Sequence, residues 1–137
     1  VTCAAMCMKK TLKQFQEDGL PIEGSANWLK MANTYGYTVS PSDPTGYSSD
    51  SKKVYDEILN YLKSGYPVII TVNQNNTHWV VVTDFIGDPN ISSSKYNADY
   101  YICADPARNG NGGNNKKLSN AYEYNSSGPR DYLIYKK

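Results

Sequence analysis

The spacing of apolar residues changes once along this chain, from a helical pattern before residue 65 to strand-like runs after it. Three segments with helical spacing come first, each followed or ended by a glycine: 2–18, 25–35 and 51–65. Four segments rich in Val, Ile, Tyr and Thr follow: 66–72, 78–87, 98–105 and 130–137. Helices followed by strands predict an α+β domain, with the N-terminal helices packed on one face of an antiparallel sheet.

Each predicted helix has an apolar stripe that we expect to face the core. The first stripe consists of Ala5, Met6, Met8, Leu12 and Phe15. The second helix, with Ser25 as its cap, would bury Trp28, Leu29 and Ala32. The third, capped by Ser51 or Asp50, repeats Val54, Ile58 and Leu62 at intervals of four.

Two polar segments separate these elements. Residues 38–51 carry two prolines, a glycine and several small polar residues, and they predict a loop. Residues 106–129 are too long and polar for a tight turn, so we expect a surface excursion that holds one short helix within KKLSNAYEY (116–124).

With 137 residues, the chain has the length of one domain, 1–137, with a single core. Its 14 Lys and Arg are scattered and balanced by 13 Asp and Glu, which argues against a nucleic-acid partner. No apolar run is long enough to span a bilayer, and the first residues lack a signal-peptide pattern. We therefore expect a soluble domain without membrane insertion, as a whole protein or as a fragment of a longer one.

Cysteine and tyrosine usage bears on location. Cys3 and Cys7 lie one helical turn apart, where their side chains run parallel and are poorly placed to form a disulfide bond. Thirteen tyrosines with many Asn, Ser and Lys residues would suit a protein that handles sugars or peptides outside a cell. An extracellular or cell-wall location is the expectation.

His78, the only histidine, starts the apolar run HWVVVTDF. If residues 78–86 and 98–105 form an antiparallel hairpin with its turn at Ile91 and Ser92, Asp105 lies directly opposite His78, within hydrogen-bonding reach. Such a pair supplies the base and the orienting residue of a nucleophilic site. The alternatives are a partly buried histidine satisfied by a carbonyl group, and an aspartate that bonds its own backbone in a strand-ending turn before Pro106.

The missing member of such a site is a thiol, which is best stabilised at a helix N-terminus. Cys3 is the candidate, whereas Cys7 and Cys103 have the apolar neighbours of core residues. Zinc bound by Cys3, Cys7 and His78 would have no evident fourth ligand, so we expect neither a metal nor another cofactor.

The stretches SGYPVIITVNQNNTHWVVVTDFIGDPN and YYICADPARNG carry a family resemblance. They resemble papain-like cysteine peptidases of the double-glycine-leader, or bacteriocin-processing, family, which run G-x-P-V-I, then H-[FW]-V-V-V-T-G, then V-x-D-P. The resemblance covers 54–110 well and implies that His78 is the catalytic base and that Asp105 orients it. Asp84 departs from the pattern, because the family usually has Gly there.

The resemblance leaves two alignments of the first helix open. In the favoured one, the family's Ala-Met pair falls on Ala5 and Met6, and the nucleophile lies two residues before Val1. In the other, Cys3 is the nucleophile, but Lys9 and Lys10 then fall where the helix should bury Ala-Met.

Under either alignment, the family's oxyanion-stabilising Gln would precede Val1, and Asn73 and Gln74 are expected in a solvated turn. The resemblance implies a cysteine peptidase or amidase that acts on peptides, including peptide stems of the bacterial cell wall. The alternatives are a non-catalytic peptide-binding domain that lacks the nucleophile, and a metal-binding or structural domain.

Overall fold

The computed structural model describes residues 1–23, 27–41, 51–72, 78–107, 110–126 and 129–137. Its described strands form a six-stranded sheet in the order β1-β6-β2-β3-β4-β5, and every neighbouring pair is antiparallel. The strands are β1 (Thr38–Ser40), β2 (Val68–Thr71), β3 (Trp79–Phe85), β4 (Tyr101–Asp105), β5 (Gly113–Lys117) and β6 (Tyr132–Lys136). The four predicted strands are confirmed as β2, β3, β4 and β6, with ends that move by at most three residues.

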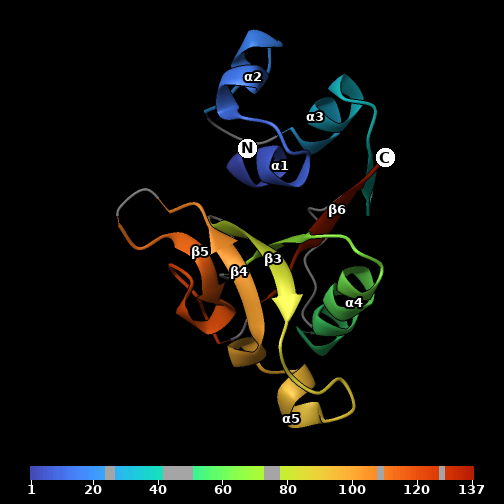
Figure 1. Ribbon diagram of the computed structural model, residues 1–137, viewed down its shortest axis with the longest axis vertical. Coiled ribbons are helices and arrows are strands. Elements are labelled where there is room, and N and C mark those ends of the chain that lie inside the picture. Colours follow the sequence, from blue (N-terminus) through green and yellow to red (C-terminus); the bar gives the residue numbers. More distant parts are fainter. Residues whose placement is uncertain (24–26, 42–50, 73–77, 108–109, 127–128) are drawn as a thin grey trace.

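The centre of the sheet is covered on both faces, because alternate residues of one strand enter two different cores. Val68 and Ile70 of β2 pack with α4 (Ser51–Lys63), whereas Ile69 between them packs with α1 (Thr2–Cys7). The helices α2 (Leu12–Glu17) and α3 (Trp28–Thr34) lie beyond α1 on its side of the sheet, at the top of Figure 1. The α+β prediction is confirmed, but the third predicted helix covers the opposite face from the first two.

The first predicted helix, 2–18, is two helices in the structure. The chain leaves α1 through Lys9, whose φ of 55° is left-handed, and α2 starts at a new cap. Thr11 Oγ1 accepts from the Gln14 backbone N–H at 3.1 Å, and Gln14 Oε1 accepts from the Thr11 N–H at 2.8 Å. This reciprocal capping box stabilises a separate helix start, so the continuous-helix prediction is wrong.

The buried faces of α1 and α3 differ in part from the prediction. Ala5, Met8 and Phe15 lie in the core as predicted, but Met6 is 38% exposed. On α3 the buried pair is Met31 and Ala32, whereas Leu29 is 55% exposed, contrary to the prediction.

The caps of α3 and α4 agree with the sequence only in part. Asn27 caps α3, because its Oδ1 accepts from the Lys30 N–H at 2.9 Å; the predicted cap Ser25 lies outside the described residues, as does Asp50. The third predicted helix is α4, which buries Val54 and Ile58 and leaves Leu62 partly buried.

The two predicted loops contain short strands. β1 lies in segment 38–51 and pairs with β6, and β5 lies in segment 106–129 and pairs with β4. The residues of β5 are Gly, Asn and Lys, which lack the apolar alternation typical of a strand. The short helix expected within 116–124 is the 3₁₀ helix η2 (Leu118–Asn120), and α5 (Ser92–Lys95) and η1 (Ala98–Tyr100) were not predicted.

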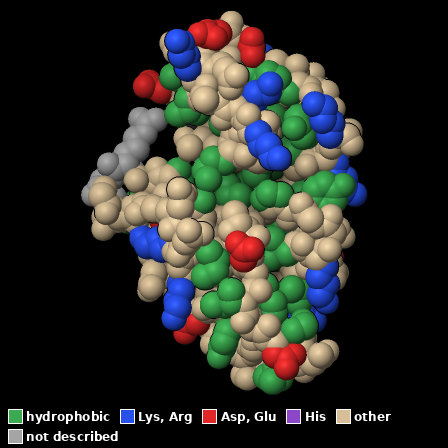
Figure 2. All heavy atoms as spheres, in the orientation of Figure 1, with side chains coloured by type: hydrophobic (Ala, Val, Ile, Leu, Met, Phe, Trp, Pro, Cys, Tyr) green, Lys and Arg blue, Asp and Glu red, His purple; other side chains and the backbone are tan. Residues whose placement is uncertain are grey.

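The surface in Figure 2 carries charges of both signs. Lys and Arg side chains lie over its upper half and along both sides of its lower half, with Asp and Glu side chains among them. Within the described part of the chain, no helix is long and apolar enough to cross a membrane.

Candidate active site

Asp105 ends β4, and its carboxyl group is held by backbone donors. Oδ1 accepts from the Ala107 N–H at 3.0 Å, and Oδ2 accepts from the Tyr122 N–H at 2.7 Å. The bond from Ala107 is the strand-ending turn that the sequence predicts before Pro106. The Asp105 side chain is 0% exposed, so these two bonds fix its position in the absence of competing water.

His78 precedes β3 and forms the third contact of this carboxyl group. Its Nε2 lies 2.7 Å from Asp105 Oδ1, and its side chain is 13% exposed. The two residues are diagonal neighbours, not directly opposed as the sequence predicts. Val81 pairs with Ala104, so the register sets Asp105 opposite position 80.

The geometry defines the roles of the two imidazole nitrogens. A carboxylate accepts, so the Nε2 that faces Asp105 is assigned the proton, and Nδ1 is an acceptor without a hydrogen-bond partner among the described residues. The His78 carbonyl accepts from the Val72 N–H at 3.2 Å, which ties its backbone to the end of β2. The Tyr122 ring meets the imidazole edge to face, with ring centroids 5.5 Å apart and planes at 84°.

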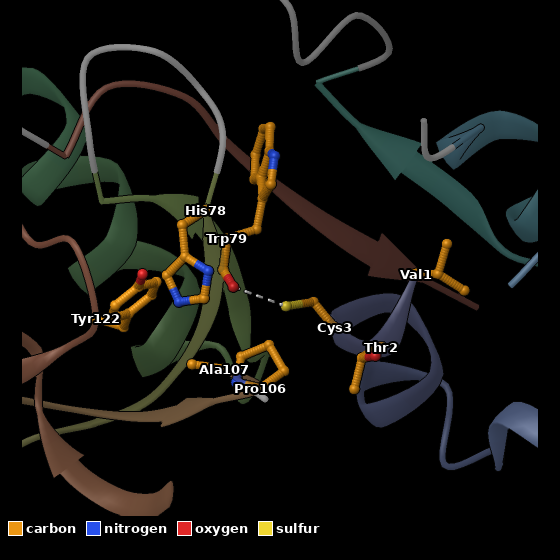
Figure 3. Close-up of a pocket in the computed structure, with 8 residues that line it drawn as sticks. All are labelled: Val1, Thr2, Cys3, His78, Trp79, Pro106, Ala107 and Tyr122. Carbon is orange, nitrogen blue, oxygen red and sulfur yellow. Dashed lines mark hydrogen bonds between the residues drawn. The ribbon is translucent and has the colours of Figure 1, made fainter. Parts of the chain in front are cut away.

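A cavity of about 380 Å³ opens beside this pair, between α1 and the sheet. Its lining residues are Val1, Thr2, Cys3, His78, Trp79, Pro106, Ala107 and Tyr122. Figure 3 shows His78 and Cys3 on facing sides of it, with the Trp79 carbonyl between them.

The structure places Cys3 in this cavity wall, but its thiol group donates a hydrogen bond to the backbone. Cys3 Sγ donates to the Trp79 carbonyl at 3.3 Å, and the residue is 3% exposed. Burial raises the pKa of the Cys3 thiol to about 12. A thiol with so high a pKa keeps its proton at neutral pH, and this one links α1 to β3 through the Trp79 carbonyl.

The other two cysteines lie outside the cavity lining. Cys103 is fully buried in β4, as predicted, and Cys7 is half-buried against the core under α1. Burial raises the pKa of each thiol to about 12. Within the described residues, no group of three His, Cys, Asp or Glu side chains could hold a metal ion.

Sequence reasoning missed Tyr122, which lies in the segment predicted as a surface excursion. Its only sequence signal is its place in the predicted short helix KKLSNAYEY, which η2 and Tyr122 occupy. Asn73 and Gln74 lie outside the described residues.

An N-terminal helix packed on an antiparallel sheet, with a His just before one strand and an Asp at the end of the neighbouring strand, is the arrangement of a papain-like α+β domain. The sequence matches the Peptidase_C39 like family over residues 1–130, and the chain belongs to that family. This membership indicates a function related to cysteine peptidases. No curated protein and no solved structure was found to match the chain.

Proposed function

We propose that this domain carries the base and the orienting residue of a cysteine peptidase or amidase. The observation that supports this most strongly is the 2.7 Å contact between His78 Nε2 and Asp105 Oδ1, with Nδ1 unpartnered among the described residues beside a cavity. In the proposed reaction, His78 Nδ1 takes the proton of a cysteine thiol and the thiolate attacks the amide carbonyl. His78 then gives the proton to the leaving amine as the C–N bond breaks, which leaves the acyl group on the cysteine as a thioester. A water molecule, deprotonated by His78, hydrolyses this thioester to the carboxylic acid, and His78 returns the proton to the cysteine; Asp105 keeps the imidazole oriented throughout.

Cys3 is a poor candidate for the attacking thiol. Its Sγ donates to the Trp79 carbonyl, and burial raises its pKa to about 12, so a thiolate there is disfavoured. Met8, the C-cap of α1, is also buried. Lys9 follows it, beyond the end of α1, and is exposed. The alignment that makes Cys3 the nucleophile would need Lys9 and Lys10 on a buried helical face, and neither residue lies on a helix.

We therefore place the nucleophile two residues before Val1, where the alignment of Ala5 and Met6 with the family pattern puts it. Val1 and Thr2 line the same cavity as His78, so a residue just before them would start close to the imidazole. Cys3 would then be a core residue next to the site and not the reacting thiol itself. The gene sequence upstream of Val1 tests this directly, because the proposal requires a Cys-Gly pair there, preceded by a Gln.

The substrate we propose is a peptide or amide, with the peptide stems of the bacterial cell wall as one form. Such a substrate goes with an extracellular or cell-wall location. The support is the polar surface rich in Tyr, Asn and Ser, which suits carbohydrate-linked peptides.

The experiment is hydrolysis of peptide and stem-peptide substrates by the natural full-length protein. We expect His78→Ala to lower kcat/KM by at least ~100-fold, the usual size of a general acid–base contribution, with the fold retained. Lys30→Ala, at an exposed position on α3, is the matched control and should leave turnover unchanged. Turnover within a few-fold of the unmodified protein in His78→Ala would refute the base assignment.

A second candidate is a non-catalytic domain that binds peptides in the same cavity. The buried Cys3 thiol favours it if the natural protein has no cysteine before Val1. In that case the full-length protein should bind stem peptides without cleaving them, and His78→Ala should change only the affinity.

A further inference from the structure

The segment that follows β5 is anchored on both sides of Tyr122. Before it, Leu118 and Ala121 are buried in the core shared with α4, and the Ala121 N–H donates to the Leu118 carbonyl at 3.1 Å. After it, the Asn125 N–H donates to the Val72 carbonyl at 2.8 Å. Tyr122 is therefore presented to the cavity by a segment whose two ends are fixed to the sheet and its core (Figure 3).

This segment is connected to both members of the His78 and Asp105 pair. The Tyr122 N–H donates to Asp105 Oδ2 at 2.7 Å. Val72, whose carbonyl accepts from Asn125, donates its own N–H to the His78 carbonyl at 3.2 Å. The backbone that follows Tyr122 is thus linked to His78 through Val72, and the backbone of Tyr122 itself is bonded to Asp105.

The Tyr122 side chain adds a third connection, to the imidazole itself. The two rings meet edge to face at 84°, with centroids 5.5 Å apart, which is a favourable arrangement for aromatic pairs. An imidazole with one hydrogen bond can still rotate about its side-chain bonds, and a flanking ring limits that rotation. The same ring lies against the imidazole whose Nε2 contacts Asp105 Oδ1, so it fills space beside that imidazole that water would otherwise occupy.

We propose that Tyr122 is the positioning residue of this site. Its N–H fixes the Asp105 carboxyl group, and its ring fixes the imidazole plane and keeps water from the bond between His78 Nε2 and Asp105 Oδ1. The catalytic meaning of this role rests on the proposed peptidase function, but the shielding of the bond is a property of the resting protein.

The test is the exchange of the Nε2 proton of His78 with water, measured by NMR on protein labelled with ¹⁵N-histidine. His78 is the only histidine in the chain, so the resonance needs no assignment. We expect a downfield proton that exchanges slowly in the unmodified protein. Tyr122→Ala and Tyr122→Leu should speed its exchange by about tenfold, the scale of one aromatic pair, and Tyr122→Phe should retain slow exchange.

The control is Tyr100→Ala, which removes an exposed tyrosine ring at the other end of β4 and should leave the exchange rate unchanged. Tyr122→Leu keeps apolar bulk without an aromatic ring, so it decides the question if Tyr122→Ala does not fold. An exchange rate within twofold of the unmodified protein in Tyr122→Leu would overturn the proposal. So would the absence of a slowly exchanging proton in the unmodified protein.

This measurement separates the proposal from the proposed function. The exchange rate is read without substrate or nucleophile, so Tyr122 can prove to shield the bond in a protein that does not hydrolyse peptides. Conversely, the protein could hydrolyse peptides while the His78 Nε2 proton exchanges no faster in Tyr122→Leu. That result would support the peptidase proposal and contradict the proposed role of Tyr122.

Discussion

His78 Nε2 and Asp105 Oδ1 lie 2.7 Å apart although their residues are diagonal, not directly opposed, on neighbouring strands. Diagonal positions on one face of an antiparallel pair are roughly 7–8 Å apart at the backbone, a span that an imidazole and a carboxymethyl group can bridge. The Asp105 carboxyl group reaches this position because the N–H groups of Ala107 and Tyr122 hold it there. The pair therefore depends on the turn after β4 as much as on the sheet register.

Removal of the Asp105 carboxyl group should destabilise the fold as well as the site. Asp105→Ala leaves the N–H groups of Ala107 and Tyr122 without their acceptor, and we expect the free energy of unfolding to fall by about 2–3 kcal/mol. Urea denaturation measures this change. Asp84→Ala, at an exposed position on β3, is the matched control and should shift stability by less than ~0.5 kcal/mol. Equal effects of the two substitutions would contradict the assigned bonds.

Stability should decline with rising pH above 9, because burial raises the pKa of the Cys3 thiol from 9 to about 12. Below pH 9 both the folded and the unfolded chain keep this proton. Between pH 9 and 12 the unfolded chain loses it first, so the free energy of unfolding falls in that window.

The Cys3→Ala variant isolates this contribution. From pH 8 to pH 10, the unmodified protein should lose about 1.4 kcal/mol more than Cys3→Ala does, whatever the baseline stability of the variant. Chemical denaturation at the two pH values gives the comparison. Identical losses in the two proteins would show that the Cys3 thiol ionises in the folded state as readily as in the unfolded one.

The conformation of Lys9 predicts a stabilising substitution. A left-handed φ of 55° is strained for any residue with a side chain, so Lys9→Gly should raise the free energy of unfolding by ~0.5–1 kcal/mol. Lys13→Gly, inside α2, should instead lower it by ~0.5–1 kcal/mol. Thermal or urea unfolding of the two variants should therefore give opposite signs, and the same sign in both would contradict the helix break at Lys9.

Much of the fold could be predicted where an apolar period identifies the element. Helix α4 has an apolar period of four, and strands β2, β3, β4 and β6 are runs rich in Val, Ile, Tyr and Thr; all five were predicted. Strand β5 could not be found in this way, because its Asn and Lys side chains are exposed or half-buried and only its backbone pairs with β4. The break between α1 and α2 could not be predicted either. It depends on the capping box of Thr11 and Gln14, whereas the apolar spacing over the same residues favours one continuous helix.

Only two residues of the candidate site could be predicted. His78 and Asp105 come from runs whose pairing can be inferred from the chain, although a bulge between Val82 and Asp84 changes the register along the strand pair. Tyr122 comes from a polar segment whose path is set by burial of Leu118 and by the bond from Asn125 to Val72. No local pattern encodes such long-range contacts.

Alkylation by iodoacetamide at pH 6, followed by mass mapping, is the most direct test of His78 as the base that activates a thiol before Val1. In the natural full-length protein, we expect label on a cysteine upstream of Val1 and none on Cys3, Cys7 or Cys103, whose pKa values burial raises to about 12. His78→Ala should slow that labelling by at least ~100-fold, whereas Lys30→Ala should not. Label on Cys3, or a labelling rate that does not depend on His78, would contradict the proposed site.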